Sequence, residues 1–286
     1  MRERSSGSED SEFSSRRTNA DYVPVSAIVI ARNESKRIGW CLSSLTWCAQ
    51  VVVVVDEADV ATATIARKFT DDVYLRSDKN FDANRVWALQ FARYEWILPV
   101  DADEYVPELL SRRISDIIIA DSADVIRLHY RVFAYGGFLE HAVTDNTKFM
   151  FKKTFGTFEG RVHNIQKIYL ERNPRIQDTG LNPLLFVVHL SHPTIAYTLD
   201  KTNRFTDLIA QGLFDSGKRF TNRDFIFTLI RATFYWMIKR KAWKDGTNGM
   251  FFAILAVFSE VVALMKLWEI QTMSVKKYEE QLEKKT

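Results

Sequence analysis

The stretch "WILPVDADEYV", Trp96 to Val106, joins five mostly apolar residues to a cluster of three carboxylates. Asp101, Asp103 and Glu104 fall within four positions, although carboxylates this close repel one another unless water or a bound cation screens them. The apolar run predicts a buried strand. The carboxylates therefore follow the carboxyl end of a strand, and the surrounding sequence must explain why.

Three further apolar runs precede this one, at 25–31, 51–55 and 72–75. Between the runs lie stretches with apolar residues at helical spacing, at 35–47, 60–69 and 83–95. Strands that are apolar on both faces and alternate with helices predict a parallel sheet covered on two sides. The fold class is therefore predicted to be α/β. Cys41 and Cys48 lie seven positions apart and are expected on one helix, which would then extend to position 48, as ordinary buried thiols.

Each predicted strand is followed by polar residues: Asn33-Glu34, then Asp56, then Lys79-Asn80 with Asn84-Arg85, and finally the acidic cluster. In an open parallel sheet, ligands bind in the crevice beyond the carboxyl ends of the strands. Any one of these strand ends is unremarkable, because every strand must end in something polar. Together they indicate a binding site along one edge of the sheet.

The acidic cluster fits a divalent cation. Two aspartates at i and i+2 project the same way from an extended segment, and hard oxygen ligands in small number suit Mg²⁺ or Mn²⁺ with substrate phosphates. The alternative is a solvated loop that feeds a helix from Pro107, with Glu104 and Glu108 as first-turn acids. The sequence contains no G-x-x-x-x-G-K-[ST] or G-x-G-x-x-G motif that would offer another phosphate site.

The carboxyl-terminal part differs in character. From Lys218 to Thr286 the chain has 13 Lys and Arg against 7 Asp and Glu, so the basic excess lies here although the whole chain has a net charge of only +3. The pattern does not indicate nucleic-acid binding, because no basic stretch interleaves with exposed aromatic residues. Residues 1–22 are rich in serine and charge and lack an apolar run, which predicts a disordered tail.

Two apolar helices are expected at 225–238 and 250–268, separated by a break at Asp245-Gly246. Both are shorter or more interrupted by charge than a membrane-spanning helix, and flanking basic and Trp residues favour a surface that lies in the membrane interface. The alternative is a helical pair that packs on the catalytic domain or on a second copy in a homodimer. The predicted organisation is a tail (1–22), a catalytic domain (23–200) and a helical region (201–286).

The segments "SAIVIARNESKRIGWCLSSL", "VVVVVDEADVATATIA" and "WILPVDADEYV" resemble family 2 glycosyltransferases of the GT-A fold, and the similarity continues more loosely over roughly residues 25–270. Within the family the chain is similar to the branch of lipopolysaccharide-core glucosyltransferases. The resemblance implies a mostly parallel Rossmann-like sheet and metal-dependent inverting transfer from a nucleotide sugar, UDP-linked, with Mn²⁺ or Mg²⁺. It implies nucleoside binding by Glu34 and Asp56, further donor contacts by Asn84 and Arg85, and a metal–diphosphate site at Asp101 and Asp103.

The resemblance also implies that His189 is a further ligand of the metal. The alternative is that His189 is a buried, hydrogen-bonded histidine of a strand with no role in metal binding. Two departures stand out. The family's glycine-containing D-S-G-S-T-D-G-T loop is replaced by "DEADVATATIA", where Asp59 is an open candidate for the second aspartate. Where the branch has a His-Glu pair, this chain has Val162-His163-Asn164, so the candidates for the catalytic base are His163 and Glu159, then Asp145.

The expected function is transfer of a sugar to a hydroxyl of a lipid-linked or cell-surface glycan, by a cytoplasmic enzyme on the inner face of the cell membrane. A sugar-phosphate nucleotidyltransferase is the alternative enzyme, but "ARNESKRIG" lacks its glycine-rich basic loop. A phosphatase of D-x-D type fits less well. Its nucleophilic aspartate follows the first strand of its sheet, whereas Asp101 and Asp103 follow the fourth predicted strand. A degenerate transferase domain that serves as a scaffold is the non-enzyme alternative. The sequence does not name the sugar, the acceptor or the linkage.

Overall fold

The computed structural model describes residues 22–77, 81–143, 147–158 and 166–272. The predicted tail lies outside these residues except for Tyr22. The chain divides into two compact units, each made of several segments. Among the described residues, the first comprises positions 22–102, 111–126 and 149–177, and the second comprises positions 103–110, 127–148 and 178–272.

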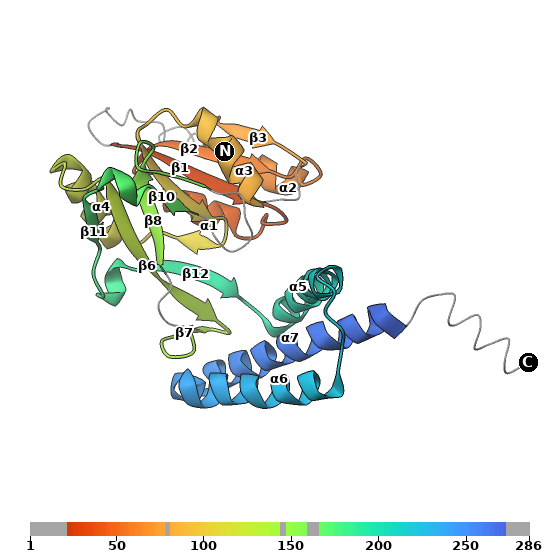
Figure 1. Ribbon diagram of the computed structural model, residues 1–286. Coiled ribbons are helices and arrows are strands. Elements are labelled where there is room, and N and C mark those ends of the chain that lie inside the picture. Colours follow the sequence, from red (N-terminus) through yellow and green to blue (C-terminus); the bar gives the residue numbers. More distant parts are fainter. Residues whose placement is uncertain (1–21, 78–80, 144–146, 159–165, 273–286) are drawn as a thin grey trace, which may run out of the picture. The chain divides into compact units, whose positions relative to one another are not determined.

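The first unit is built on four parallel strands in the order β3-β2-β1-β4 (Figure 1). Their bounds are β1 (Val23–Ala31), β2 (Cys48–Val55), β3 (Val73–Leu75) and β4 (Trp96–Asp101). Val29 of β1 lies opposite Val53 of β2 and Val100 of β4. The strand β8 (Thr147–Lys152) pairs antiparallel with β4. The predicted α/β class with a mostly parallel sheet is confirmed.

Strands β1, β2 and β4 are largely buried, as their apolar runs predicted, whereas β3 at the edge of the sheet is only partly buried. Every residue of β1 from position 25 to 31 is buried. Ile28, Val52, Ile97 and Phe151 belong to one continuous core, and burial of aliphatic and aromatic side chains of this size contributes about 1.5–3 kcal/mol each. The helices of this part are α1 (Ile38–Ser43), α2 (Val60–Ala66), α3 (Phe81–Ala88) with a 3₁₀ turn (Leu89–Phe91), and α4 (Glu108–Ile119).

The first helix is shorter than predicted, and the placement of Cys48 in it is wrong. Helix α1 ends at Ser43, where the Ser44 hydroxyl donates a hydrogen bond of 2.7 Å to the carbonyl oxygen of Cys41. Cys48 instead opens β2, opposite Val23 of β1. Both cysteines are free and buried, as expected, and burial raises the pKa of the Cys48 thiol well above its ordinary value.

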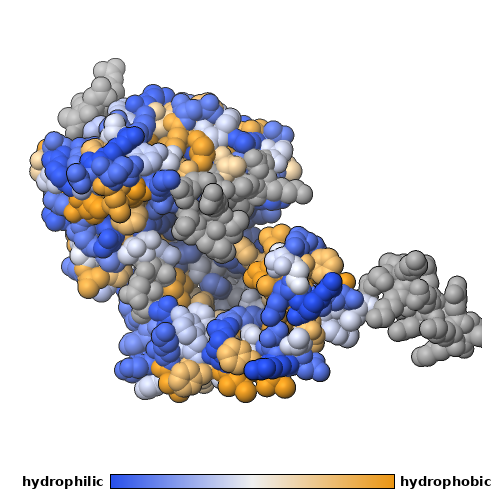
Figure 2. Space-filling view, viewed as in Figure 1, coloured by the Kyte–Doolittle hydropathy of each residue, from blue (hydrophilic) through white to orange (hydrophobic). Residues whose placement is uncertain are grey.

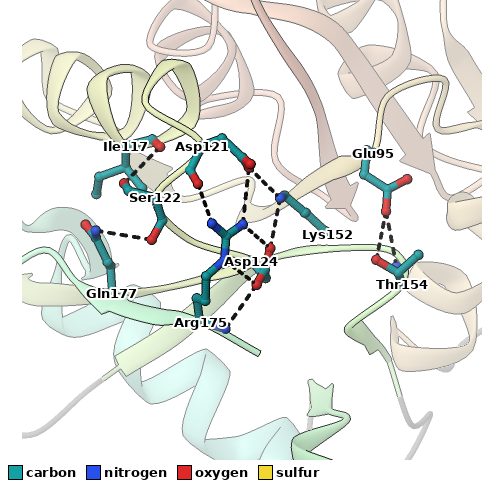
Figure 3. A network of polar contacts seen from close by, with 9 residues as sticks. All are labelled: Glu95, Ile117, Asp121, Ser122, Asp124, Lys152, Thr154, Arg175 and Gln177. Atoms are coloured by element: carbon teal, nitrogen blue, oxygen red, sulfur yellow. Dashed lines mark hydrogen bonds and ion pairs between the residues drawn. The ribbon is translucent and has the colours of Figure 1, made fainter. Parts of the chain in front are cut away.

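A network of ion pairs in the first unit links the segments around Asp124, Lys152 and Arg175 (Figure 3). Lys152 Nζ donates to Asp121 and Asp124, each at 2.9 Å, and the Arg175 guanidinium donates to Asp124 at 2.7 and 2.9 Å. These bonds hold the end of β8 and the start of β11 (Ile176–Asp178) beside the residue that precedes β6. Hydrogen bonds from Arg175 and then Lys152 outweigh partial burial and hold the pKa of Asp124 well below its usual range. Two short strands, β9 (Gly156–Thr157) and β10 (Lys167–Ile168), and a 3₁₀ turn (Leu170–Arg172) complete this part.

The second unit contains strands in the order β6-β12-β5, with β7 paired on β6. Their bounds are β5 (Glu104–Tyr105), β6 (Val125–Ala134), β7 (Gly137–Leu139) and β12 (Val187–His192), with a 3₁₀ turn (Pro183–Leu185) before β12. Strand β12 runs parallel to β6 and antiparallel to β5. Because β5 follows a turn at 102–103, the acidic cluster is not the single extended segment that was predicted.

Three helices follow these strands and lie side by side (Figure 1): α5 (Ile195–Asp215), α6 (Asn222–Phe234) and α7 (Gly246–Thr272). Helix α7 packs against both of the others. A π-helical turn (Tyr235–Lys239) and a 3₁₀ turn (Ala242–Asp245) connect α6 to α7. The predicted break at position 246 is confirmed, since Gly246 has a φ of +64°, which a residue without Cβ adopts at little cost.

Asp245 anchors this connection to the hairpin of β6 and β7. Its buried carboxylate, 1% exposed, accepts hydrogen bonds of 2.8–3.0 Å from the backbone N–H groups of Glu140, His141 and Ala142. The Nδ1 atom of His141 lies 2.9 Å from the same carboxylate. Successive N–H groups that point at one anion form a nest, which fixes both segments.

Candidate active site

The carboxyl ends of β1, β2 and β4 lie at one edge of the first unit's sheet. The register places Ala31 opposite Val55 and Ile30 opposite Asp101, so these three strands end at nearly the same level. Glu34 and Asp56 follow the ends of β1 and β2. The structure therefore brings the residues of the predicted donor site to a common edge, as the alternation of strands and helices requires.

Arginine side chains hold both of the predicted nucleoside-binding acids. Arg37 donates to the two carboxylate oxygens of Glu34 at 2.7 and 2.8 Å, and only a tenth of the arginine side chain is exposed. Arg32 Nε lies 3.2 Å from the Asp56 carboxylate, which also accepts a hydrogen bond from the backbone N–H of Ala58. A bidentate arginine contact fixes the orientation of a carboxylate, so Glu34 presents a defined edge.

Asp59 acts as the helix cap of α2 and as the partner of the loop after β1. Its carboxylate accepts hydrogen bonds from the backbone N–H of Thr62 at 3.2 Å and of Asn33 at 2.6 Å. Burial alone would raise the pKa of Asp59, but hydrogen bonds from Thr62, Asn33 and Glu34 outweigh it and lower the pKa. Asn33, in the loop after β1, has a left-handed backbone conformation with φ +60°. Asparagine is one of the non-glycine residues that adopt this conformation most readily.

Arg85 reaches from α3 to the first aspartate of the acidic cluster. Its Nη2 atom lies 2.5 Å from Asp101 Oδ1, and Arg85 and its neighbour Asn84 are both buried. The Cys41 thiol donates to the backbone carbonyl of Asp101 at 3.4 Å. The predicted donor-binding residues of α3 thus lie against the end of β4, and Arg85 places a positive charge on the Asp101 carboxylate.

In the second unit the structure brings Asp103 and His189 together. His189 Nε2 lies 3.4 Å from Asp103 Oδ2, and the backbone N–H of Leu190 donates to the Asp103 carbonyl at 2.8 Å. His189 lies on β12 opposite Glu104 of β5, and its ring meets that of Tyr130 edge to face. The two residues were predicted to share a metal, and their side chains are close enough to bind one ion.

Glu104 does not lie in a solvated loop, and the alternative interpretation of the cluster is wrong for this residue. It is 1% exposed and forms a short ion pair with Lys148 Nζ, whose side chain is also largely buried. Glu108 does lie in the first turn of α4, as that alternative expected. Lys148 was not identified from the sequence. It could have been sought as the partner of Glu104, because a carboxylate that is buried needs a cation beside it.

His192 is a further residue that the sequence did not single out. It lies three residues after His189, packs between the rings of Tyr135 and Phe252, and has its Nδ1 atom 2.5 Å from the Ser191 hydroxyl. Burial, followed by the nearby positive charge of Lys201, lowers its pKa to about 4. At neutral pH this imidazole is therefore uncharged.

Asp103 and His189 offer one carboxylate and one imidazole to a divalent cation, and the carboxylate is the donor that suits Mg²⁺ or Mn²⁺. Within the described ranges, no group of three or more His, Cys, Asp or Glu side chains gathers as a metal cluster would. A metal held here would need substrate oxygens or water for its remaining positions, which is how Mg²⁺ and Mn²⁺ bind nucleotides. The three candidates for the base, Asp145, Glu159 and His163, lie outside the described residues.

Residues 26–172 match the sequence profile of the family described as glycosyl transferase family 2. The chain belongs to this family. This family 2 glycosyltransferase carries the acidic strand end, the donor-side acids and the three base candidates within the matched segment, and His189 beyond it. The GT-A type of α/β fold that the sequence predicted agrees with its membership.

Curated relatives of this glycosyltransferase cover most of both chains. An uncharacterized glycosyltransferase of Rickettsia conorii, RC0292, is 24% identical over 261 residues, which cover 86% of this chain and 90% of the relative. The lipopolysaccharide core biosynthesis glycosyltransferase LpsC of Rhizobium meliloti is 22% identical over 258 residues, covering 86% and 93%. A solved structure of S. aureus TarS 1-349 in complex with UDP-GlcNAc has a TM-score of 0.45, 15% identity and coverage of 86% and 90%.

Proposed function

We propose that this glycosyltransferase moves a sugar from a UDP-linked donor to a hydroxyl of a lipid-linked or cell-surface glycan, with inversion and with the help of a divalent metal. The observation that carries the proposal is the common sheet edge at which Glu34, Asp56 and Asp101 follow three parallel strands. The name of the relative LpsC supports an acceptor of the lipopolysaccharide class.

In this proposal the donor-side acids bind the nucleoside. Glu34 and Asp56 are oriented by Arg37 and Arg32, so their carboxylates can accept hydrogen bonds from base or ribose without first losing conformational freedom. Arg85 lies against Asp101 and would contact the donor together with Asn84. The guanidinium suits a phosphate or a sugar hydroxyl, because it offers several donors in a fixed plane.

Asp103 and His189 are the proposed metal ligands, with Asp101 two residues earlier in the chain as the third. When bound, Mn²⁺ or Mg²⁺ would neutralise charge on the departing diphosphate. The backbone hydrogen bond from the N–H of Leu190 to the carbonyl of Asp103 holds Asp103 in place. The pairing of β12 with β5 sets His189 opposite Glu104. The neighbouring Glu104–Lys148 ion pair is buried beside this turn.

The transfer step requires a base. A bond forms between the acceptor oxygen and the anomeric carbon while the bond from that carbon to the diphosphate breaks, and the acceptor proton passes to a side chain within hydrogen-bond reach. We rank His163 and Glu159 ahead of Asp145 for this role. The ordinary pKa of histidine suits a general base near neutral pH. Glu159 lies four residues before His163 and could reach the same acceptor hydroxyl.

The domain organisation in this proposal is a tail (1–22), a catalytic domain (23–200) and a helical region (201–286). An acceptor that is linked to lipid would place the enzyme in the cytoplasm, at the inner face of the cell membrane. This localisation agrees with a cytoplasmic source of nucleotide sugar and with a membrane source of acceptor.

A panel of nucleotide sugars with Mn²⁺ or Mg²⁺ tests the proposal. We expect one UDP-sugar to raise the melting temperature in the presence of metal and to be hydrolysed slowly without acceptor. Asp101→Asn and Asp103→Asn should abolish turnover and weaken metal-dependent donor binding, whereas Asp116→Asn, on the exposed face of α4, should change neither. Near-normal turnover in either of the first two variants would contradict the metal assignment, and donor binding without hydrolysis or transfer would indicate a scaffold.

A further inference from the structure

Helices α6 and α7 each expose a row of large apolar side chains. On α6 and the following turn the row repeats at helical spacing and consists of Phe227, Ile230, Phe234 and Ile238. On α7 it consists of Phe251, Ile254, Phe258, Met265 and Trp268. Figure 2 shows hydrophobic side chains gathered along the lower edge of this helical segment, where Figure 1 draws α6. Soluble proteins rarely expose contiguous apolar surface of this extent without a partner.

Helix α7 has the composition of a lipid-contacting helix rather than of a core helix. The segment Ala242–Thr272 has a mean hydropathy of 2.1 in its most apolar window, and only 22% of that window is buried. A core helix of equal hydropathy would be mostly buried. Among the described residues this is the one helix that is long and apolar enough to cross a membrane.

The charged residues within the apolar run of α7 point toward the neighbouring helices. Glu260 pairs with Arg231 of α6, and Lys266 Nζ lies 2.6 Å from the Asp207 carboxylate of α5. These pairs tie α7 to both neighbours, and each charge of the apolar run is balanced by an opposite charge on the adjacent helix. A spanning arrangement would carry both pairs into hydrocarbon, which is costly, whereas a helix that lies along the surface can keep them at the level of the headgroups.

The turn between α6 and α7 is basic and exposed. Lys239, Lys241 and Lys244 are all exposed, beside Trp243, which is 55% exposed. The one acid of this turn, Asp245, is buried in its nest of backbone N–H groups, so its charge does not face outward. A cluster of lysines with an aromatic side chain at the edge of an apolar surface is complementary to anionic headgroups.

From this geometry we infer that α6, the basic turn and α7 form a docking surface for an anionic lipid bilayer, on which the helices lie parallel to the membrane plane. Helix α5 also exposes the large apolar side chains Phe205, Leu208 and Ile209, which the sequence pattern did not reveal. Trp236 is not part of the surface, because it packs with Phe252 in a buried cluster. The inference concerns a surface and stands apart from the transfer reaction.

Co-sedimentation of the full chain with vesicles tests it. We expect binding to phosphatidylcholine vesicles that contain phosphatidylglycerol, weaker binding as salt increases, and weak binding to phosphatidylcholine alone. Changing Lys239, Lys241 and Lys244 together to Gln should reduce binding to anionic vesicles at least about tenfold. The matched control changes Lys36, Lys68 and Arg113, which are exposed on the first unit, to Gln and should bind normally.

Variants of the exposed apolar side chains distinguish lipid binding from association with a second copy of the chain. Phe234→Ser combined with Phe251→Ser should reduce binding to both kinds of vesicle, whereas Ile119→Ser, on an exposed position of α4, should not. A chain that stays in the supernatant with anionic vesicles at low salt overturns the inference. So does a dimer in solution that the Phe234→Ser change dissociates without any vesicle binding, since the surface would then belong to a second copy. Resistance to extraction by alkaline carbonate would overturn the in-plane arrangement in favour of a spanning α7.

Discussion

Replacement of Asp245 by alanine should destabilise the helical part of the protein severely. The carboxylate accepts hydrogen bonds from three consecutive backbone N–H groups, of Glu140, His141 and Ala142, and lies 2.9 Å from His141 Nδ1. A donor left without an acceptor costs about 1–3 kcal/mol when it is buried. Ala142 is buried while Glu140 is exposed, so water can restore only part of the loss. We expect a decrease of about 3–5 kcal/mol in the free energy of unfolding.

Asp245→Asn keeps one acceptor oxygen and should cost about half as much. The control is Asp207→Ala, which removes a carboxylate that is 63% exposed and ion-paired with Lys266, and should cost no more than about 1 kcal/mol. Denaturant unfolding followed by tryptophan fluorescence gives the free energies, and hydrogen exchange of a peptide covering 138–143 reports the three amides directly. A loss below about 1 kcal/mol in Asp245→Ala, or unchanged exchange of these amides, would refute the reasoning.

Two further predictions concern the base and the acid stability. His163→Ala and Glu159→Ala should separate the roles, because loss of the base lowers kcat while donor affinity, measured by titration with the nucleotide, stays nearly unchanged. If both variants stay active while Asp145→Asn is inactive, the ranking is inverted. Asp124 has a lowered pKa in the folded protein, so its stabilisation is present above its unfolded pKa of about 3.9 and is lost as the pH falls toward the folded value. Asp124→Asn should therefore lower Tm at pH 7 but progressively less below pH 4, and a Tm difference that is constant from pH 3 to pH 7 would contradict this.

The strands and helices of the first hundred residues could be predicted because their signals are local. Runs such as 25–31 and 51–55 carry their own evidence of burial on both faces, and polar residues mark where each strand ends. The helix boundaries were less certain, and Cys48 fell on the wrong element. Its place depends on pairing with Val23, 25 positions earlier, and nothing beside Cys48 in the sequence records that pairing.

The partners of the site residues could not be predicted for a related reason. Glu104 meets Lys148 across 44 positions, and Asp245 meets the segment 140–142 across more than a hundred. Such contacts follow from the path of the whole chain. Short-range motifs identified Asp101 and Asp103, and the family resemblance supplied His189, but only the structure places His189 beside Asp103.

The link between Asp59 and Asn33 has a consequence for the cost of binding a donor. Asp59 joins the loop after β1 to the first turn of α2, and the Thr62 hydroxyl accepts a hydrogen bond from the backbone N–H of Glu34. In many binding sites a glycine-rich loop is mobile until its ligand arrives, and part of the binding free energy is spent on ordering it. Here the loop is already cross-linked to a helix. A nucleoside that contacts Glu34 would meet an ordered surface, so little of its binding free energy would be spent on ordering this loop.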